Sequence, residues 1–482
     1  MPRLPRAILC ATLVLTLPQM AFAETTSLRA DQRAFLDTYR ELIETDTSIT
    51  TGDCTLAAGL MAERLRAAGV PDAAITPFGV PDHPKEGGLV VQWPGSDPDL
   101  KAILLLAHID VVDAKRTDWE RDPYTLTEED GYFYGRGTFD DKAQASIWVD
   151  LLARLAQDNR HLKRPLKLAL TCGEESSTAF NGAEWLVANR RDLIDAEYAL
   201  NEGGGGYTNG TPLSAGGALV MQTMQVGEKM MQVYRLETTN PGGHSSMPVP
   251  DNAIYRLSKA LLALEAHEFP VELNDTTRNF FETLGAAKGD EVGEAMSAIV
   301  RDPSDAAAIA VLDADPVYHA TLRTTCVATM LEAGHANNAL PQRATATINC
   351  RILPGQDAQE IRDQLVQVLD DPEVSVTIVP PVWKASPPPP LDPRILGTVK
   401  RIAADYFPGV PLVTTMTAGS TDAIFLTGAG IPTYGPPGPW INPDGNGIHG
   451  ADERLEVSSL LTGRDYLYAL VTELADQGEG RE

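Results

Sequence analysis

The chain of 482 residues carries 66 acidic and 39 basic side chains, which gives a formal net charge of -27. An acidic surface of this kind repels nucleic acid and anionic membranes, so we exclude both as partners. The length exceeds what one hydrophobic core usually supports, and we therefore expect two domains.

The first residues predict a secretory signal peptide over residues 1–23. Arg3 and Arg6 precede an apolar run at residues 7–17, and residues 21–23 read Ala-Phe-Ala, a small-residue cleavage site. The run is shorter than the roughly 20 residues that cross a bilayer, and no later window is long and apolar enough. We expect a protein without a membrane span, secreted across the inner membrane into the periplasm or the extracellular medium.

Four cysteines follow this segment, and they are too few and too scattered for a disulfide scaffold. They are Cys54, Cys172, Cys326 and Cys350. An oxidising compartment permits one bridge, and the favoured pair is Cys326 with Cys350, which we expect on neighbouring strands.

The first half of the chain alternates helices with short apolar strands. Helices are expected at residues 31–44, 55–68, 144–157 and 182–189, and strands at residues 88–92, 102–107, 166–171 and 198–200. Buried strands that alternate with helices predict an α/β fold around a largely parallel sheet. In such sheets the reactive groups collect beyond the carboxyl ends of the strands.

A different pattern begins near Gly227 and predicts an inserted α+β domain. Residues 230–237 and 344–352 alternate as strands, with a long helical region between them. The proline-rich stretch at residues 380–393 is a stiff connector back to the first domain. The predicted division is a first domain at residues 24–226 and 385–482 with an insert at residues 227–384.

The first chemistry-bearing residue is a histidine at a strand end. His108 follows the strand at residues 102–107, and Asp110 lies where it can accept the second ring N–H of His108 and fix its tautomer. A lone strand-end histidine is more often an ordinary hydrogen-bonded residue than a ligand. The residues that follow reverse that expectation.

A glycine-bearing turn at residues 135–142, Gly-Arg-Gly-Thr-Phe-Asp-Asp-Lys, delivers paired carboxylates at the start of a helix. One carboxylate can bridge two cations, which explains a need for aspartate rather than asparagine. We assign Asp140 to metals, whereas Asp141 suits the common role of a helix N-cap.

Carboxylates also end the next two strands. Adjacent Glu174 and Glu175 would repel each other unless a cation or a shared proton intervenes. A metal-held Glu175 beside a free Glu174 resolves this, and Glu174 becomes the general base. Glu202 closes another strand, and His449 lies far down the chain.

In this order and spacing the residues resemble the dizinc amidohydrolase and exopeptidase family of aminoacylase, carboxypeptidase G and succinyl-diaminopimelate desuccinylase. The resemblance implies a zinc-exopeptidase-like catalytic domain, with a mostly parallel sheet flanked by helices, and an inserted α+β lid and dimerisation domain. It also implies two zinc ions per chain and Glu174 as the group that activates water. The implied ligands are His108, Asp140 and Glu202 for one zinc, and Asp140, Glu175 and His449 for the other. Cobalt or manganese could occupy the same mixed nitrogen and oxygen site.

The insert contributes the substrate residues that the resemblance implies. His244, in Gly-Gly-His-Ser-Ser-Met-Pro at residues 242–248, matches a lid histidine that reaches the partner subunit's site, which implies a homodimer through the lid. Asn338 and Arg351 resemble a carboxylate-binding pair, with Arg351 suited to a forked grip. Gly419, Ser420 and Thr421 resemble a further substrate loop. Alternatively, His244 only closes a turn and Arg351 only pairs with a surface acid.

Two departures and one enlargement refine the resemblance. Gly173 and Asn349 each stand where many relatives carry aspartate, and neither change removes a ligand. The helical segment at residues 254–322 makes the lid larger than in the simplest members. Together with the motif at residues 242–248, this favours the Gly-Xaa carboxypeptidase (carboxypeptidase S) branch.

The predicted function is a zinc-dependent metallo-exopeptidase that cleaves an amide bond next to a free carboxylate. The substrate is either a short peptide, as for a carboxypeptidase or dipeptidase, or an N-acyl amino acid, as for an aminoacylase. An inactive binding protein on the same scaffold would usually have lost a ligand or the base, and none is missing. A structural dimer would tolerate loss of the ligands.

Overall fold

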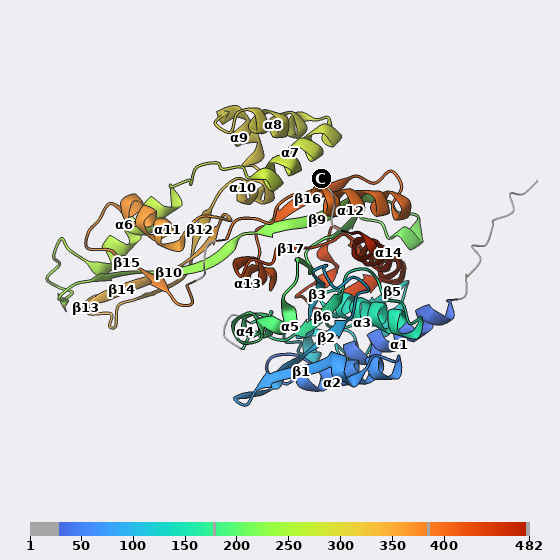
Figure 1. Cartoon of the computed structure of the whole chain (residues 1–482). Coiled ribbons are helices and arrows are strands. Elements are labelled where there is room, and N and C mark those ends of the chain that lie inside the picture. Colours follow the sequence, from blue (N-terminus) through green and yellow to red (C-terminus); the bar gives the residue numbers. More distant parts are fainter. Residues whose placement is uncertain (1–27, 177–179, 383–385, 479–482) are drawn as a thin grey trace, which may run out of the picture.

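The computed structural model describes residues 28–176, 180–382 and 386–478, which form a broad body and an elongated arm (Figure 1). We call the body the catalytic domain and the arm the lid. The predicted signal peptide lies outside the described residues, and so does the predicted lid boundary at residue 384. Of the helices in the described ranges, none is both long and apolar enough to cross a membrane.

A six-stranded sheet forms the centre of the catalytic domain. Its strands are β1 (Ile75–Val80), β2 (His83–Trp93), β6 (Leu166–Thr171), β3 (Ile103–His108), β7 (Tyr198–Leu200) and β17 (Thr433–Tyr434), in that spatial order. The last four run parallel, whereas β1 and β2 are antiparallel at one edge. The prediction of an α/β fold on a largely parallel sheet is therefore confirmed, and β6, β3 and β7 end at the same edge.

Helices cover both faces of this sheet. One face packs against α1 (Ala30–Glu44), α2 (Cys54–Ala67), α3 (Lys142–Gln157), α12 (Pro393–Tyr406) and α14 (Val457–Asp476), and the other against α4 (Gly182–Asn189), α5 (Arg191–Ile194) and α13 (Ala423–Gly428). Side chains of β3 alternate between the two cores, since Leu105 packs into the first and Leu104 into the second. Both are fully buried, and each leucine stabilises the fold by about 1.5–3 kcal/mol.

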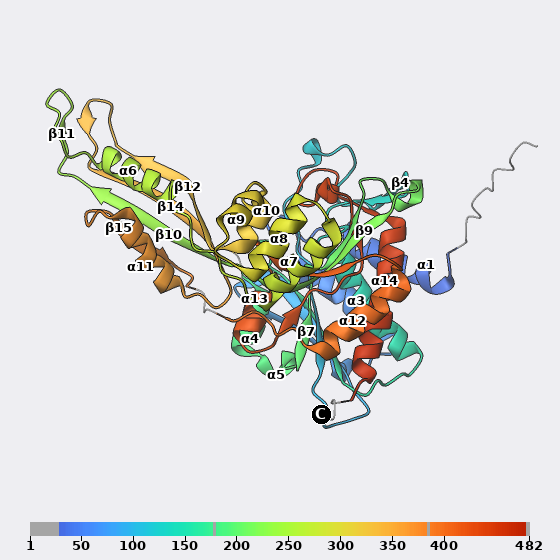
Figure 2. The ribbon, with the colours of Figure 1, turned by 90° about the horizontal axis from the view of Figure 1, so that it is seen from above.

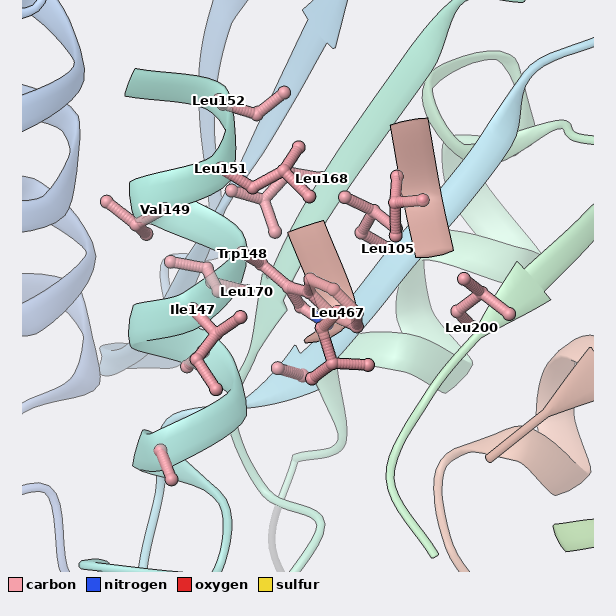
Figure 3. Close-up of a cluster of buried hydrophobic side chains, with 14 of the residues drawn as sticks. Leu105, Ile147, Trp148, Val149, Leu151, Leu152, Leu168, Leu170, Leu200 and Leu467 are labelled. Carbon is pink, nitrogen blue, oxygen red and sulfur yellow. The ribbon is translucent and has the colours of Figure 1, made fainter. Parts of the chain in front are cut away.

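The helix that follows the Asp140 turn is central to the larger core. Figure 3 shows Trp148, Leu151 and Leu152 of α3 directed at the leucines of β3 and β6. The indole N–H of Trp148 donates to the backbone carbonyl of Leu106 at 3.1 Å, so this buried ring has no unpaired polar group. The start of α3 is therefore fixed against the end of β3.

Smaller sheets complete the catalytic domain. One consists of β16 (Leu412–Thr417), β9 (Leu219–Glu228), β8 (Gly205–Thr208) and β18 (Trp440–Ile441), and another of β19 (Arg454–Glu456), β5 (Tyr132–Tyr134) and β4 (Thr127–Glu129). Short 3-10 turns are η1 (Asp72–Ala74), η2 (Arg116–Asp118), η3 (Leu213–Ala215) and η4 (Gly445–Gly447).

The lid is an antiparallel sheet covered by two helices. Its strands, in spatial order, are β12 (Thr325–Ala333), β14 (Arg343–Ile352), β10 (Met230–Thr239) and β15 (Ser375–Val379), and α6 (Ala253–Glu265) and α11 (Ala358–Leu369) pack on it. The short strands β11 (Gly243–His244) and β13 (Ala339–Leu340) pair at the far tip (Figure 2). The strands predicted at residues 230–237 and 344–352 are confirmed, as is the Cys326–Cys350 disulfide between β12 and β14.

The expectation that the helical segment enlarges the lid is wrong for most of that segment. Four helices, α7 (Asp275–Lys288), α8 (Glu291–Arg301), α9 (Ala306–Leu312) and α10 (Pro316–Leu322), form a separate core with Val413 of β16. The hydroxyl of Thr414 also donates to Asn279 of α7 at 2.8 Å. Of the helices in this segment, only α6 packs on the lid sheet. The sequence could not show this, because an apolar helix face indicates that the helix is covered but not which sheet covers it.

The expectation of a single disulfide also needs correction. Cys54, the first residue of α2, is bonded to Cys172, the residue that follows β6, across 118 residues of sequence. Neither cysteine lies within a strand, so the pattern of predicted strands could not reveal this bridge.

Candidate active site

Three neighbouring parallel strands deliver the predicted site to one edge of the central sheet. His108 is the last residue of β3, Glu174 and Glu175 follow β6, and Glu202 follows β7. Because β3 lies between β6 and β7, these side chains meet over its end. His449 approaches from the loop after η4.

Asp140 lies between the two histidines, one carboxylate oxygen toward each. Its Oδ1 lies 3.0 Å from Nε2 of His108, and its Oδ2 lies 3.0 Å from Nε2 of His449. Oε2 of Glu202 is 3.7 Å from His108, and Oε2 of Glu175 is 3.0 Å from His449. The two groups His108–Asp140–Glu202 and Asp140–Glu175–His449 each have their ligand atoms within 4.8 Å of one another. The structure thus brings all five predicted ligands together in the predicted sets.

The chemistry of this cluster fits two divalent cations. Burial, reinforced by Glu202, raises the pKa of Glu174 well above its usual range, and the carboxylates of Asp140 and Glu175 raise that of His449 to about 10. One oxygen of Glu202 is buried without a hydrogen-bond partner among the described residues. Cations at this position would compensate the clustered negative charge, and the mixed nitrogen and oxygen donors suit zinc, cobalt or manganese.

Asp110 connects two of the ligand segments. Nδ1 of His108 lies 3.1 Å from the backbone carbonyl of Asp110 and 3.6 Å from its Oδ1. A carbonyl only accepts, so Nδ1 carries the proton and Nε2 is left to bind a metal. Oδ2 of Asp110 accepts the backbone N–H of Glu175 at 3.0 Å. The tautomer of His108 is therefore fixed mainly by the backbone carbonyl of Asp110 rather than by its carboxylate. The carboxylate of Asp110 instead holds the segment that carries Glu175.

A cavity of about 620 Å³ joins the predicted base to the predicted substrate residues. Glu174, Arg351 and the loop at residues 419–421 all line it. The guanidinium of Arg351 makes no ion pair or hydrogen bond within the part of the chain that the structure describes. It is therefore available to a substrate carboxylate, and the alternative that it pairs with a surface acid is excluded for those residues.

The hydroxyl groups of Ser420 and Thr421, in the predicted substrate loop, form hydrogen bonds within the protein. Oγ of Ser420 donates to the backbone carbonyl of Lys229 at 2.8 Å. Thr421 donates to Oε2 of Glu228 from its hydroxyl at 2.9 Å and from its backbone N–H at 3.0 Å. These side chains fix the loop to the junction between β9 and β10, a role that the sequence did not indicate.

His244 and Asn338 do not reach the cavity of their own chain. Both are exposed at the tip of the lid, where β11 pairs with β13 (Figure 2). Asn338 precedes β14 at the tip, whereas Arg351 lies near the other end of β14, and the eight steps from Arg343 to Arg351 alone span roughly 26 Å. The expected pair of Asn338 with Arg351 is therefore not formed within one chain.

Comparison with known proteins identifies the family. The model of peptidase family M20/M25/M40 matches residues 104–473, a range that includes all five predicted ligands. The chain belongs to this family. The N-fatty-acyl-amino acid synthase/hydrolase PM20D1 of Homo sapiens is 29% identical over 386 residues, 78% of this chain and 75% of that protein. The probable carboxypeptidase S-like 2 of Dictyostelium discoideum is 28% identical over 389 residues, 80% of this chain and 73% of that protein.

A solved structure supports the fold of this M20/M25/M40 peptidase. The M20 family metallo-carboxypeptidase Sso-CP2 from Sulfolobus solfataricus superposes with a TM-score of 0.67 at 18% identity, over 92% of this chain and 99% of the other. The predicted family resemblance, including its carboxypeptidase S-like relatives, is confirmed. The protein is a metallopeptidase of this family.

One residue of this M20/M25/M40 peptidase that we did not single out from sequence holds two ligand segments together. Glu453 is fully buried, and its carboxylate accepts four hydrogen bonds from the Asp140 turn, three of them from backbone N–H groups. The donors are Arg136 Nη1 at 2.7 Å and the backbone N–H groups of Gly137 at 2.9 Å, Phe139 at 2.9 Å and Asp140 at 3.1 Å. Arg136 also donates to the carbonyl of Gly450, beside His449, at 2.6 Å.

The expected capping role of Asp141 is wrong for this peptidase. Asp141 occupies the N-cap position of α3, but its side chain makes no cap hydrogen bond. Its Oδ2 is buried and has no hydrogen-bond partner among the residues described. Burial raises the pKa of this carboxyl well above its ordinary value. The side chain therefore faces the protein interior rather than the first turn of the helix.

Proposed function

We propose that this M20/M25/M40 peptidase is a dizinc exopeptidase that cleaves the amide bond next to a substrate's free carboxylate. The observation that carries the proposal is that Glu174 and the unpaired guanidinium of Arg351 line the same cavity. Glu174 transfers protons at the scissile bond, and Arg351 binds the carboxylate of the substrate.

The residues divide the reaction between them. Zinc ions held by the two ligand sets would polarise the scissile carbonyl and favour ionisation of the attacking water. Glu174 accepts the proton of that water and returns it to the leaving amine. Arg351 binds the substrate carboxylate with two parallel N–H donors, which orients the amide bond toward Glu174.

Two substrate classes place a carboxylate against Arg351. We favour a short peptide that loses its carboxy-terminal residue, in line with the carboxypeptidase S-like relative. The N-acyl amino acids that the name of PM20D1 describes are the second candidate. Apolar side chains in the cavity, including Met231, Val233 and Ile424, favour an apolar group in either substrate.

We also propose a homodimer that forms through the lid. His244 and Asn338 are exposed at the tip, far along β14 from Arg351, which supports a role for both at the site of a neighbouring chain. The edge strand β12 exposes large apolar side chains, with Met330 at 69% and Leu331 at 65% relative exposure. An exposed apolar edge strand favours association with another chain.

Export of the protein completes the proposal. The sequence begins with a signal-like segment, and two disulfides suit an oxidising compartment such as the periplasm or the extracellular medium.

The test compares the mature protein with Glu174→Gln on a panel of Gly-Xaa dipeptides and N-acyl amino acids. We expect about two zinc ions per chain in both proteins, by elemental analysis, and a turnover of the variant that is about 10²–10⁴-fold lower. Chelation should abolish wild-type activity, and zinc should restore it. Full activity of Glu174→Gln, or activity that survives complete removal of metal, contradicts the proposal.

A further inference from the structure

We propose that the Cys54–Cys172 disulfide positions the catalytic base, so that turnover depends on this bridge and not on Cys326–Cys350. The inference rests on the role proposed above for Glu174. It assigns a function to a crosslink that would otherwise be taken only as a stabiliser of the fold.

The bridge meets the chain two residues from the base. Cys172 directly follows β6, and Gly173 alone separates it from Glu174. Both sulfur-bearing residues are buried, Cys54 at 2% and Cys172 at 4% exposure, and their Cα atoms are 6.1 Å apart. Any displacement of Cys172 is therefore passed to Glu174 through two peptide units.

The backbone beyond the bridge has little room to move. Gly173 has a φ of +96°, and a Cβ there would lie 1.8 Å from the carbonyl oxygen of Phe180. The N–H of Gly182 donates to the carbonyl of Cys172 at 2.7 Å, and Asn181 donates to that of Gly173 at 3.3 Å. These contacts fix the start of the turn only as long as Cys172 itself stays in place.

The other half of the bridge is anchored beside a second ligand segment. Thr47 donates from its hydroxyl to the carbonyl of Ile109 at 2.6 Å, and its own carbonyl accepts the N–H of Val111 at 3.3 Å. Ser48, which is also bridged to Val111, accepts the N–H of Gly52 at its carbonyl at 2.8 Å. Cys54 follows within two residues.

The disulfide thus links two ligand strand ends from outside the sheet. One end is the His108 segment, held through residues 47–54, and the other is the Cys172 segment that carries Glu174 and Glu175. A displacement of about 1 Å at a reacting group can cost roughly 100-fold in rate. The bridge therefore acts where small movements have large catalytic consequences.

The second disulfide provides a matched control. Cys326–Cys350 crosslinks β12 and β14 of the lid and touches none of the ligand segments. Because β14 is also paired along its length with β10, the neighbouring Arg351 stays in place without this bridge. A bridge that only stabilises the fold would change the melting temperature in either case and leave turnover of the folded enzyme alone. A positioning bridge changes turnover at temperatures where the protein is fully folded.

The experiment uses two double variants of the full mature chain, Cys54→Ala with Cys172→Ala and Cys326→Ala with Cys350→Ala. Alanine leaves no unpaired buried hydroxyl. With zinc loaded and folding checked by circular dichroism, the first variant should lose about 10-fold or more in kcat at a nearly unchanged KM. Amide exchange at Glu175 and Gly182 should also become faster. The second variant should keep wild-type kcat.

A second measurement covers failure of the first variant to fold. The Cys326→Ala/Cys350→Ala protein has only the Cys54–Cys172 bridge, which a trialkylphosphine reduces with water to two thiols and a phosphine oxide, without a dithiol that would bind zinc. Loss of kcat should follow the appearance of these thiols, with the zinc content unchanged.

Wild-type kcat in the folded Cys54→Ala/Cys172→Ala variant, or full turnover after complete reduction, overturns the inference. Normal turnover of Glu174→Gln would instead overturn the proposed role of the base, so the two failures are distinguishable.

Discussion

Glu453 is the residue on which the geometry of the bridging ligand depends. Its carboxylate accepts the N–H groups of Gly137, Phe139 and Asp140, and it lies four residues after His449. In Glu453→Gln, one acceptor oxygen becomes an amide NH₂ that faces two donors. We expect metal affinity to fall about 10- to 100-fold and the free energy of unfolding by about 1–3 kcal/mol. Calorimetric zinc titration of the metal-free protein measures the first effect.

Glu456, the last residue of β19 and three residues after Glu453, offers a matched control. It is 2% exposed, and its carboxylate accepts the N–H of Ser214 at 2.8 Å and the indole N–H of Trp440 at 3.1 Å. Glu456→Gln should destabilise the fold without changing zinc affinity, because these partners lie outside the ligand segments. Equal zinc affinity in both variants would show that Glu453 does not position the ligands.

The sequence predicted the metal ligands better than the residues that hold those ligands in position. His108, Glu175 and Glu202 stand at the ends of apolar runs, and a strand end is visible as a change in hydrophobicity. Glu453 binds backbone N–H groups 313 to 316 residues away, and no residue type marks those donors. Asp141 fits a cap by type and position, yet its side chain turns inward, which only the packing decides.

The junction between β9 and β10 connects the catalytic domain to the lid, and it also holds the substrate loop. Burial raises the pKa of Glu228, at this junction, from its ordinary value of 4.5 to about 8. Between these two pH values the folded protein holds a proton that the unfolded chain releases. The stability that this proton provides is complete below pH 4.5 and is lost as the pH rises through about 8.

Glu228→Gln stays neutral at every pH and should remove this dependence. From about pH 5 to pH 8, the free energy of unfolding of the wild type should fall by roughly 2–4 kcal/mol relative to that of the variant. Denaturant unfolding at several pH values measures the difference. Glu332→Gln, at an exposed position on β12, should follow the wild-type curve. Parallel curves for wild type and Glu228→Gln would contradict a buried proton at the junction.

For the helices and strands, hydrophobic periodicity predicted which elements exist but not where each one packs. The strands at residues 230–237 and 344–352 were expected and found, because their side chains alternate with burial. The helices α7 to α10 pack on β16 of the catalytic domain instead of enlarging the lid. An amphipathic stripe fixes which face of a helix is buried, whereas the choice between two sheets depends on contacts distant in sequence.

At the scale of the whole molecule, two predicted substrate residues lie far from the cavity of their own chain. Figure 1 shows the lid extending away from the catalytic domain, so that β13 lies at the far end of the arm. In the proposed homodimer, His244 and Asn338 at that tip would meet Arg351 and Glu174 of the neighbouring chain. We therefore expect each complete site to combine the cavity of one chain with the lid tip of another.

Mixing two inactive variants tests this arrangement. Glu174→Gln damages a chain's own cavity, whereas His244→Ala damages the site of its partner, so a mixed dimer has one complete site. With random exchange of subunits, half of the dimers are mixed, and about a quarter of wild-type activity should return. Glu174→Gln mixed with His108→Ala should recover nothing, since both defects belong to the chain's own cavity. Full activity of His244→Ala alone, or no recovery in a mixture shown by mass spectrometry to contain mixed dimers, would establish that each chain works without the other's lid.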